Sequence, residues 1–314
     1  MDNKIIIGVD HGNRFIKSSE GIYSSGYFES LTVPPITENL LYYNGKYYSI
    51  GGNRVKYRYD KTIDETFFIL TLPALAMRLS KEGITSADVI LGVGVPLSHF
   101  QLKQKFINYF KRDNICFTYN QKKYHVNIQE VLCFPQAISG YMLHFEKYRG
   151  IDFLNLLDFG QVTLDAVKIH QGKPLIDSAI SLNWGMLKLI KTIQEQIRKE
   201  TGIEITEEQI EMTLQGKKAL FFDDRINKII ETTTITFIND MLDELRENGY
   251  ELQATMNLLM GGGVYIVQNT LDKGEHQNRI GYTEILPESQ IANAVGYERL
   301  IREALRRRWR WWAK

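Results

Sequence analysis

The sequence predicts an α/β protein made of two similar lobes. Each half of the chain opens with a predicted strand of the kind that is buried on both faces of a sheet: the short unbroken apolar run Ile5–Val9 in the first half, and Phe153–Leu157 in the second. Each strand leads into a turn in which an aspartate is closely followed by glycine, and helical patterns come later in each half. Strands and helices therefore alternate, and a length of 314 residues suits two domains.

The composition carries no charge bias. Lys and Arg number 38 and Asp and Glu 37, which leaves a formal net charge of +1. No overall field favours a polyanion, so we do not expect direct binding to DNA. The chain shows no leader pattern and no apolar run of about 18 residues, which predicts a cytoplasmic protein. Cys116 and Cys133 lack the spacing of a metal site and are expected to be reduced.

The first lobe is expected to open with strands and hairpins and to continue with helices. Asn44-Gly45 predicts a hairpin turn, and Gly83 and Pro96 predict the ends of a helix and of a strand. The expected elements are strands at 5–9, 22–33, 39–50 and 89–95, helices at 67–79 and about 102–110, and a hairpin of 115–119 with 124–128.

The second lobe is expected to repeat this opening and then to become helical. A strand at 164–169 should pair with the strand at 153–157, and residues 172–174 should turn the chain. Thr206 and Gln209 form a capping-box pattern. Expected helices include one with Leu187, Ile190, Ile193 and Ile197 on a face, and a longer one with Ile226, Ile230, Phe237, Met241 and Leu245 that ends at Asn248-Gly249.

These patterns place the boundary near residues 148–152. We expect residues 1–150 and about 287–314 to form the first domain, with residues 151–286 forming the second. The chain should return to the first lobe in a helix that follows Pro287.

The turn after the first strand has the chemistry of an anion site. The backbone N–H groups of Gly12, Asn13 and Arg14 can point at an anion, and glycine allows a phosphate to approach the backbone closely. Lys17 could reach the same anion. The turn therefore predicts a phosphate site.

Two aspartates suggest a magnesium ion. Asp10 and Asp158 each follow a buried strand, and the carboxyl ends of strands line ligand crevices in α/β sheets. Two such carboxylates can hold hydrated Mg²⁺ beside substrate phosphates. Either aspartate alone would be interpreted as a turn residue.

Three successive glycines follow the apolar run Met256–Met260. Gly261, Gly262 and Gly263 come too late in the chain for a Rossmann fingerprint, which needs its glycines after the first strand. We interpret them as a strand end that opens a helix at 264–269, whose N-terminus contacts ribose and phosphates. A close-packed turn is the alternative.

Several segments together resemble the actin, sugar-kinase and heat-shock-chaperone ATPase superfamily, and within it the plasmid-segregation actins of the ParM type. Asp10–Lys17 resembles the family's first phosphate loop, and Asp158–Asp165 resembles its second loop. The other segments match ParM-type segments; they are Gly94–Ser98, Phe134–Tyr141 and Ile205–Ile210. The resemblance extends from Ile5 to about Tyr297. The chain departs from the pattern at His11, at Gln161 and at Gln136, where ParM proteins carry Glu and actin carries Gln.

The resemblance implies an actin-like fold, with duplicated ribonuclease-H-like cores around a central nucleotide cleft. It implies a slow ATPase that binds Mg²⁺ and ATP, forms homopolymeric filaments and moves plasmid DNA through an adaptor protein. Gly160, Gln161 and Thr163 would belong to the second phosphate loop. A non-polymerising small-molecule kinase and a nucleotide-binding scaffold of the same superfamily are the alternatives.

Gln136 is the residue expected to orient the attacking water. Phosphoryl transfer needs little covalent help, so a side chain that aligns water with the γ-phosphate suffices for a slow enzyme. An amide orients water but is a poor base. Without the resemblance, Gln136 would be interpreted as a residue of a helix's first turn after Pro135.

The C-terminus concentrates positive charge and aromatic surface. Three uses compete for this segment: packing of its tryptophans on the first lobe, contact with an anionic membrane, and binding of an adaptor or a neighbouring subunit. The residues concerned are Arg302, Arg306, Arg307, Arg308, Trp309, Arg310, Trp311 and Trp312.

Overall fold

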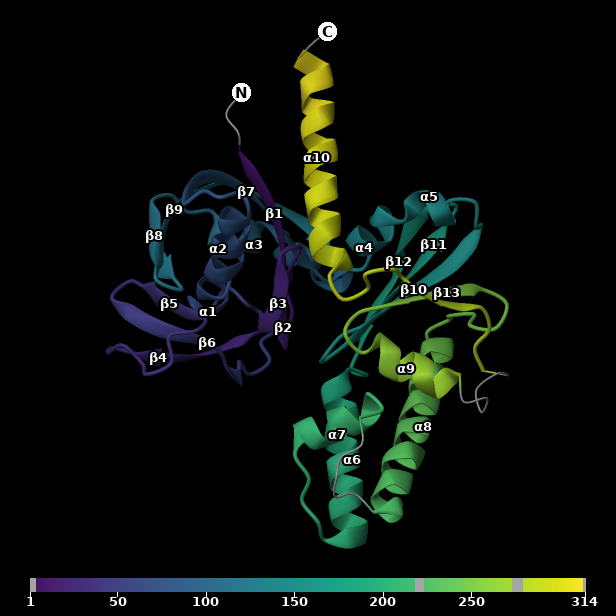
Figure 1. Ribbon diagram of the computed structural model, residues 1–314. Coiled ribbons are helices and arrows are strands. Elements are labelled where there is room, and N and C mark those ends of the chain that lie inside the picture. The colour runs from purple at the N-terminus through teal and green to yellow at the C-terminus, as the bar shows by residue number, and fades with distance from the viewer. Residues whose placement is uncertain (1–3, 218–222, 273–278, 313–314) are drawn as a thin grey trace. The chain divides into compact units, whose positions relative to one another are not determined.

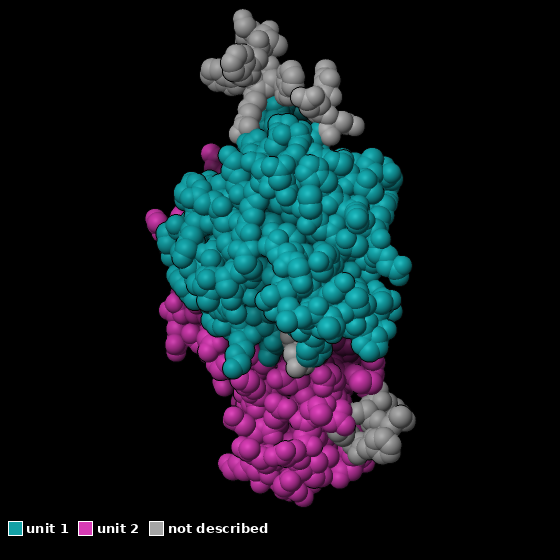
Figure 2. Space-filling model, turned by 90° about the vertical axis from the view of Figure 1, so that its left-hand side faces the viewer, with its two compact units in different colours: residues 1–145, 290–314 teal, residues 146–289 magenta. Residues whose placement is uncertain are grey.

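The computed structural model describes residues 4–217, 223–272 and 279–312 (Figure 1). The chain forms two compact units, one of residues 1–145 and 290–314 and the other of residues 146–289 (Figure 2). The observed boundaries therefore fall at 145/146 and 289/290, where the sequence predicts 150/151 and about 286/287.

Unit 1 contains a nine-stranded sheet of order β3-β2-β1-β7-β9-β8-β5-β6-β4. Parallel pairing joins β1 to β7 and β7 to β9, and β1 pairs with β2 in antiparallel fashion. The strands are β1 (Ile5–His11), β2 (Phe15–Ser18), β3 (Gly21–Ser24), β4 (Gly26–Ser30), β5 (Leu40–Tyr43), β6 (Lys46–Arg54), β7 (Ser86–Val95), β8 (Ile115–Tyr119) and β9 (Lys122–Pro135).

The helices of unit 1 come from both ends of the chain. They are α1 (Thr66–Ile69), α2 (Leu72–Lys81), the 3-10 helix η1 (Leu97–Leu102), α3 (Lys103–Phe110), α4 (Ile138–Leu143) and, after the chain returns, α10 (Ala292–Trp312).

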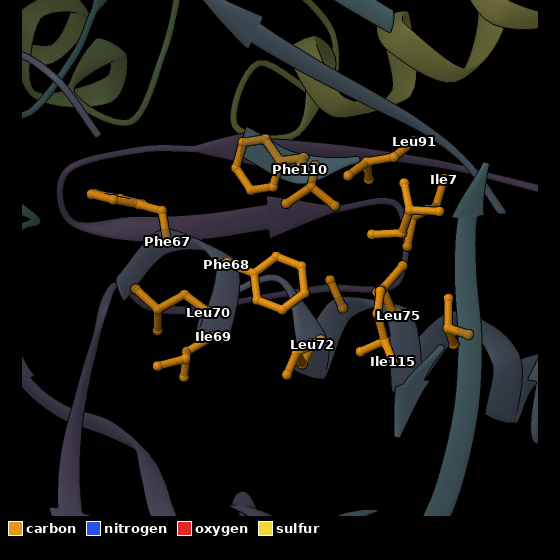
Figure 3. Packing of buried hydrophobic residues seen from close by; sticks show 14 of the residues in the cluster. Ile7, Phe67, Phe68, Ile69, Leu70, Leu72, Leu75, Leu91, Phe110 and Ile115 are labelled. Carbon is orange, nitrogen blue, oxygen red and sulfur yellow. The ribbon is translucent and has the colours of Figure 1, made fainter. Parts of the chain in front are cut away.

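The core of unit 1 lies between the sheet and the helices α1, α2 and α3. Side chains alternate across a strand, so Ile7 and Leu91 point into this core from β1 and β7. Figure 3 shows them gathered with the rings of Phe68 and Phe110. These side chains are at most 2% exposed, and their burial supplies the main stabilisation of the unit.

The other face of the same strands receives α10 at unusually short range. A Cβ atom at Gly8 of β1 would lie 2.0 Å from the carbonyl oxygen of Ala294, and one at Gly94 of β7 would lie 2.0 Å from the hydroxyl of Tyr297. A Cβ atom at Gly296, on α10 itself, would lie 2.1 Å from the carbonyl oxygen of Ser139 in α4. Glycine is therefore required where β1, β7 and α4 meet this helix.

Unit 2 repeats the core of unit 1. Its five-stranded sheet has the order β12-β11-β10-β13-β14, with β10 antiparallel to β11 and parallel to β13, as β1 is to β2 and β7. The elements are α5 (Phe145–Tyr148), β10 (Phe153–Phe159), β11 (Leu164–His170), β12 (Lys173–Leu182), α6 (Met186–Thr201), α7 (Glu207–Leu214), α8 (Asp224–Glu247), β13 (Met256–Met260), α9 (Val264–Leu271) and β14 (Thr283–Ile285).

The helical predictions for unit 2 are confirmed except at one position of α6, where Leu189 and not Leu187 is buried with Ile190, Ile193 and Ile197. Thr206 and Gln209 form the capping box at the start of α7, and all five apolar residues of the predicted stripe on α8 are buried. The helix α6 ends at Gly202, which has a left-handed conformation with φ 73°. Local sequence rules succeed here because each signal lies within its own helix.

Several strand predictions were incomplete. The strand β9 continues to Pro135, beyond the predicted end at 128, and β2, β12 and β14 were not predicted as strands. The strand β12 has exposed residues and pairs only with β11 in the sheet, so its sequence lacks the apolar run of a buried strand.

Among the helices of the described ranges, none combines the length and the apolar character that crossing a membrane requires.

Replacing Gly8 by alanine should destabilise unit 1. The added Cβ would collide with the backbone of α10, where no side-chain rotation gives relief, so we expect a loss of about 1–3 kcal/mol in the free energy of unfolding, measured by denaturant titration. Gly150→Ala is the matched control, because nothing lies within 4 Å of its new Cβ. Equal stabilities of the two variants would refute the close-contact argument.

Candidate functional site

The first turn joins β1 to β2 and is built around Asp10 and Gly12. Asp10 is 3% exposed and pairs in register with Lys17, whose Nζ lies 3.5 Å from its Oδ2. The amide of Gly12 donates to the carbonyl oxygen of Asp10 at 3.1 Å, and a Cβ on Gly12 would lie 2.6 Å from the carbonyl oxygen of Phe15. The prediction that the Gly12 N–H points at an anion is therefore wrong, because the turn uses this group internally.

Gln136 is held against Asp10. Its Nε2 donates to Oδ1 of Asp10 at 2.7 Å, and since a carboxylate only accepts, the amide orientation is fixed. The Oε1 of Gln136 is then the acceptor atom of this amide. Helix α4 starts at Ile138, so the alternative interpretation of Gln136 as a first-turn helix residue is wrong.

His11 anchors the first turn in the core of unit 1. Its ring is fully buried, stacks on Phe110 with centroids 4.6 Å apart, and lies with Nε2 2.8 Å from Oγ1 of Thr71. That hydroxyl donates its single proton to the carbonyl oxygen of Phe67 at 2.7 Å, so Nε2 of His11 must be the donor. Burial, together with the nearby Lys61 ammonium, lowers the pKa of His11 to about 3, so the ring is neutral.

Lys61 brings a positive charge to this turn from a distant part of the sequence, and the sequence analysis did not identify it. Its Nζ donates to the carbonyl oxygen of His11, although fifty positions separate the two residues. Arg14 and Lys17 also belong to the turn, and Asp10 supplies a carboxylate. These four groups carry a net positive charge, which suits a phosphate.

The second turn, residues 160–163, presents amides on one side. The carbonyl oxygens of Gly160, Gln161 and Val162 accept from the amides of Met186, Leu187 and Gly185 at the start of α6, at 3.2, 2.8 and 3.1 Å. In a trans peptide the N–H points opposite to the C=O. The N–H groups of Gln161, Val162 and Thr163 therefore point away from α6, and successive amides of this kind can form an anion-binding nest.

The same turn contains a buried donor that lacks a partner. The Nε2 of Gln161 is buried and makes no hydrogen bond within the described part of the chain. Burying such a group costs free energy unless an acceptor satisfies it, and a phosphate oxygen would do so. Thr163 donates from its hydroxyl to Oδ2 of Asp165 at 3.2 Å.

The glycine turn packs against Asp158. Asp158 lies inside β10 and is half-buried, and a Cβ on Gly261 would come within 2.4 Å of its Oδ1. Gly261 has φ 95°, which favours glycine, and Gly262 is exposed. The amide of Gly263 donates to the carbonyl oxygen of Phe159 at 3.0 Å and begins α9, so the predicted strand-glycine-helix order is confirmed.

Gly185 is a further glycine of the site that the sequence analysis did not select. A Cβ there would lie 2.3 Å from the carbonyl carbon of Val162 and 2.5 Å from that of Gln161. Gly185-Met186 is an ordinary start of an amphipathic helix, so the sequence gives no sign of this contact. The contact of Gly185 with the second turn is evident only in the tertiary structure.

A cavity of about 480 Å³ begins one helical turn from the glycine turn. It lies in unit 2 between the end of α7, one face of α8 and one face of α9. Its volume falls in the range of small-molecule sites. Lining residues are Thr213, Leu214, Gly216, Asn227, Ile230, Glu231, Thr234, Ile235, Ile266, Asn269 and Thr270.

The two aspartates of the turns are not part of a metal-ligand cluster of the described residues. Within the described ranges, no group of three or more His, Cys, Asp and Glu side chains could hold a metal ion. Asp10 already accepts from Gln136 and faces Lys17. Asp10 in unit 1 and Asp158 in unit 2 are each single carboxylates of the kind that contacts a hydrated magnesium ion through its waters.

The C-terminal predictions cannot be placed. Arg302 forms an ion pair with buried Glu298 at 3.2 Å. The side chains from Arg307 onward, including Trp309, Trp311 and Trp312, lie outside the described residues.

Two family models match this chain. The model of the N-terminal domain of actin-like proteins matches residues 8–138, and that of the C-terminal part of the archaeal MreB-like actin homologue matches residues 156–273. Among curated proteins, none matches the sequence.

Solved structures share the fold. The archaeal actin homologue Ta0583 is 20% identical, with 96% of this chain and 99% of that chain covered and a TM-score of 0.74, and it is also known in complex with ADP. ParM from a 15-stranded filament of Clostridium botulinum is 18% identical (96% and 100% covered, TM-score 0.71). Bacillus thuringiensis ParM with ATP is 14% identical (97% and 100% covered, TM-score 0.66). The predicted two-lobed actin-like fold is confirmed.

His11 should make the stability of unit 1 depend on pH. Its folded pKa of about 3 lies below the ordinary 6.5, so its contribution is fully present above pH 6.5 and is lost as the pH falls toward 3. Relative to His11→Asn, the wild type should lose roughly 2 kcal/mol of unfolding free energy between about pH 7.5 and pH 5. Denaturant titrations at both pH values measure this, with exposed His125→Asn as control. Parallel pH profiles of wild type and His11→Asn would show that the ring is not buried in neutral form.

Proposed function

The chain belongs to the actin-like proteins, and we propose that it is an ATPase that binds ATP through both turns and assembles into nucleotide-regulated filaments. The family membership is given by the two matched models, which cover residues 8–138 and 156–273. Binding of ADP by Ta0583 and of ATP by Bacillus thuringiensis ParM supports the choice of an adenine nucleotide.

The observation that carries the proposal is the nest of the second turn. Three successive amides, of Gln161, Val162 and Thr163, point away from α6 because the preceding carbonyls bind the helix. A concavity of N–H groups with a buried, unsatisfied amide donor beside it is built to receive an anion with several oxygen acceptors. A polyphosphate fits this description.

The first turn supplies the complementary charge. Lys17 and Lys61 would offset the charge of the phosphates, and the amides of Asn13 and Arg14 are its candidate backbone donors. The cavity between α7, α8 and α9 would take the base, since α9 begins at the glycine turn proposed to contact ribose and phosphates.

Hydrolysis in this proposal depends on Gln136. With its Nε2 on Asp10, the amide has its Oε1 left to accept a proton of the attacking water and hold it in line with the γ-phosphorus. Asp10 and Asp158 would position Mg²⁺ through its waters, and the ion would offset charge on the phosphate oxygens. An amide is a weak base, so turnover should be slow.

Filament assembly and DNA segregation are proposals from the family. The solved ParM filament supports self-assembly. A role in plasmid partition would need a DNA-bound adaptor protein, in keeping with a formal net charge of only +1. In this proposal, the Arg- and Trp-rich C-terminus is the segment that would bind a membrane or the adaptor. The variants at Asp158 and Gln136 leave this segment unchanged.

The purified protein should assemble with ATP and disassemble as phosphate is released. Light scattering and phosphate release, followed together at a concentration on the order of 10⁻⁵ M, test this. Asp158→Ala is the control: it should bind nucleotide but release almost no phosphate, because the ion's waters lose a carboxylate. ATP turnover without assembly would favour a small-molecule kinase or other non-polymerising member, and binding without turnover would favour a scaffold.

Gln136→Ala should lower hydrolysis roughly 10- to 100-fold, about 1.4–2.7 kcal/mol of barrier, with ATP affinity nearly unchanged. Filaments should then persist longer, because hydrolysis and not binding is the step removed. Gln136→Glu replaces the amide by the carboxyl group that ParM-type proteins carry at the matching position, and it should retain activity or raise it. A weaker ATP affinity with unchanged turnover in Gln136→Ala would assign this residue to the shape of the pocket.

A further inference from the structure

The backbone directly after Gln136 is strained. Ala137 has φ 61° and ψ −59°, and the amide of Ile138 donates to the carbonyl oxygen of Gln136 at 2.7 Å. These angles and this bond define a γ-turn of the rare hand, which a residue with a Cβ adopts at a cost in free energy. Such a conformation persists only where the surroundings hold it.

Asn293 holds this turn. Its Oδ1 accepts from the amide of Ala137 at 2.9 Å, and the residue is 6% exposed. On the other side, the amide of Gln136 donates to the carbonyl oxygen of Val95 on β7 at 2.9 Å. The backbone at Gln136 is therefore fixed by β7 on one side and by the first turn of α10 on the other.

The position of Asn293 is itself fixed by short contacts. Its neighbour Ala294 touches the backbone of β1 at Gly8, and Gly296 touches α4 at Ser139. Because backbone contacts hold α10 at these two points, the helix cannot shift without breaking both contacts. The side chain of Asn293 is therefore a rigid support for Ala137.

We propose that Asn293 is a positioning residue that sets the direction of the Gln136 side chain by stabilising the γ-turn at Ala137. The proposal rests on the proposed function of Gln136. Without the bond from Asn293, Ala137 would relax to negative φ, and the peptide groups on either side of it would rotate. The Gln136 amide would then leave its bond to Asp10, and small misplacements of a group that orients a reactant reduce turnover strongly.

The test compares substitutions at Asn293 with a matched control. Asn293→Leu removes the acceptor at similar volume and should lower kcat about 10-fold while changing ATP affinity less than about twofold. Asn293→Asp keeps an oxygen at the same place and should retain most of the turnover. Asn127→Leu is the control, because Oδ1 of Asn127 also accepts from the amide of a positive-φ residue, Asn114, at 2.9 Å but does so away from Gln136. Its turnover should match the wild type.

A second substitution at the turn separates positioning from folding. Ala137→Gly removes the cost of positive φ, so in the Asn293→Leu background it should restore turnover at least threefold, whereas a loss caused by misfolding would not respond. If Asn293→Leu does not fold, Asn293→Ala gives the same comparison. Wild-type turnover in folded Asn293→Leu, or no rescue by Ala137→Gly, would overturn the proposal. A normal rate in Gln136→Ala would instead refute the role of Gln136 itself.

Discussion

The close packing of α10 against the sheet and α4 is the constraint on which unit 1 depends. This helix comes from the C-terminal end of the chain and packs on β1, β7 and α4 at distances that exclude a Cβ at Gly8, Gly94 and Gly296. Buried Glu298 of α10 fastens the helix further, since its Oε1 accepts from the Ser19 hydroxyl at 2.7 Å and from the amide of Gly8 at 3.3 Å. The strand that carries Asp10 and the turn that carries Gln136 are thus held by one element.

The two turns share a steric constraint but differ in their backbone hydrogen bonds and in their charges. In each, an aspartate is followed two residues later by a glycine whose Cβ would meet the carbonyl oxygen three residues further on, at 2.6 Å for Gly12 and 2.9 Å for Gly160. The residue paired with the aspartate across the hairpin is Lys17 in the first turn and Asp165 in the second. A duplicated backbone therefore carries opposite charges at corresponding positions, and the first turn has the cations while the second has the amide nest.

A neutral buried histidine connects the first turn to the core. His11 is stacked on Phe110 and bonded to Thr71, so its ring packs as an apolar group with one satisfied donor. Protonation would place a charge in the core beside Lys61, and both effects lower the pKa of the ring. The main chain of the turn, at the carbonyl oxygen of His11, meanwhile binds the Lys61 ammonium. One residue thus joins core packing to the electrostatics of the proposed phosphate site.

The sequence alone determined the features whose signals are local. Apolar runs before Asp10 and Asp158, the capping box at Thr206, the stripe of α8 and the glycines after β13 each lie within a single element, so spacing and residue type suffice. Tertiary structure decided what depends on distant partners. Lys61 reaches His11 across fifty positions, Gly185 is required by the second turn, β12 is a strand because β11 pairs with it, and the γ-turn at Ala137 exists because Asn293 supports it. No local pattern encodes these contacts, since each arises from elements that fold separately and meet only in the packed unit.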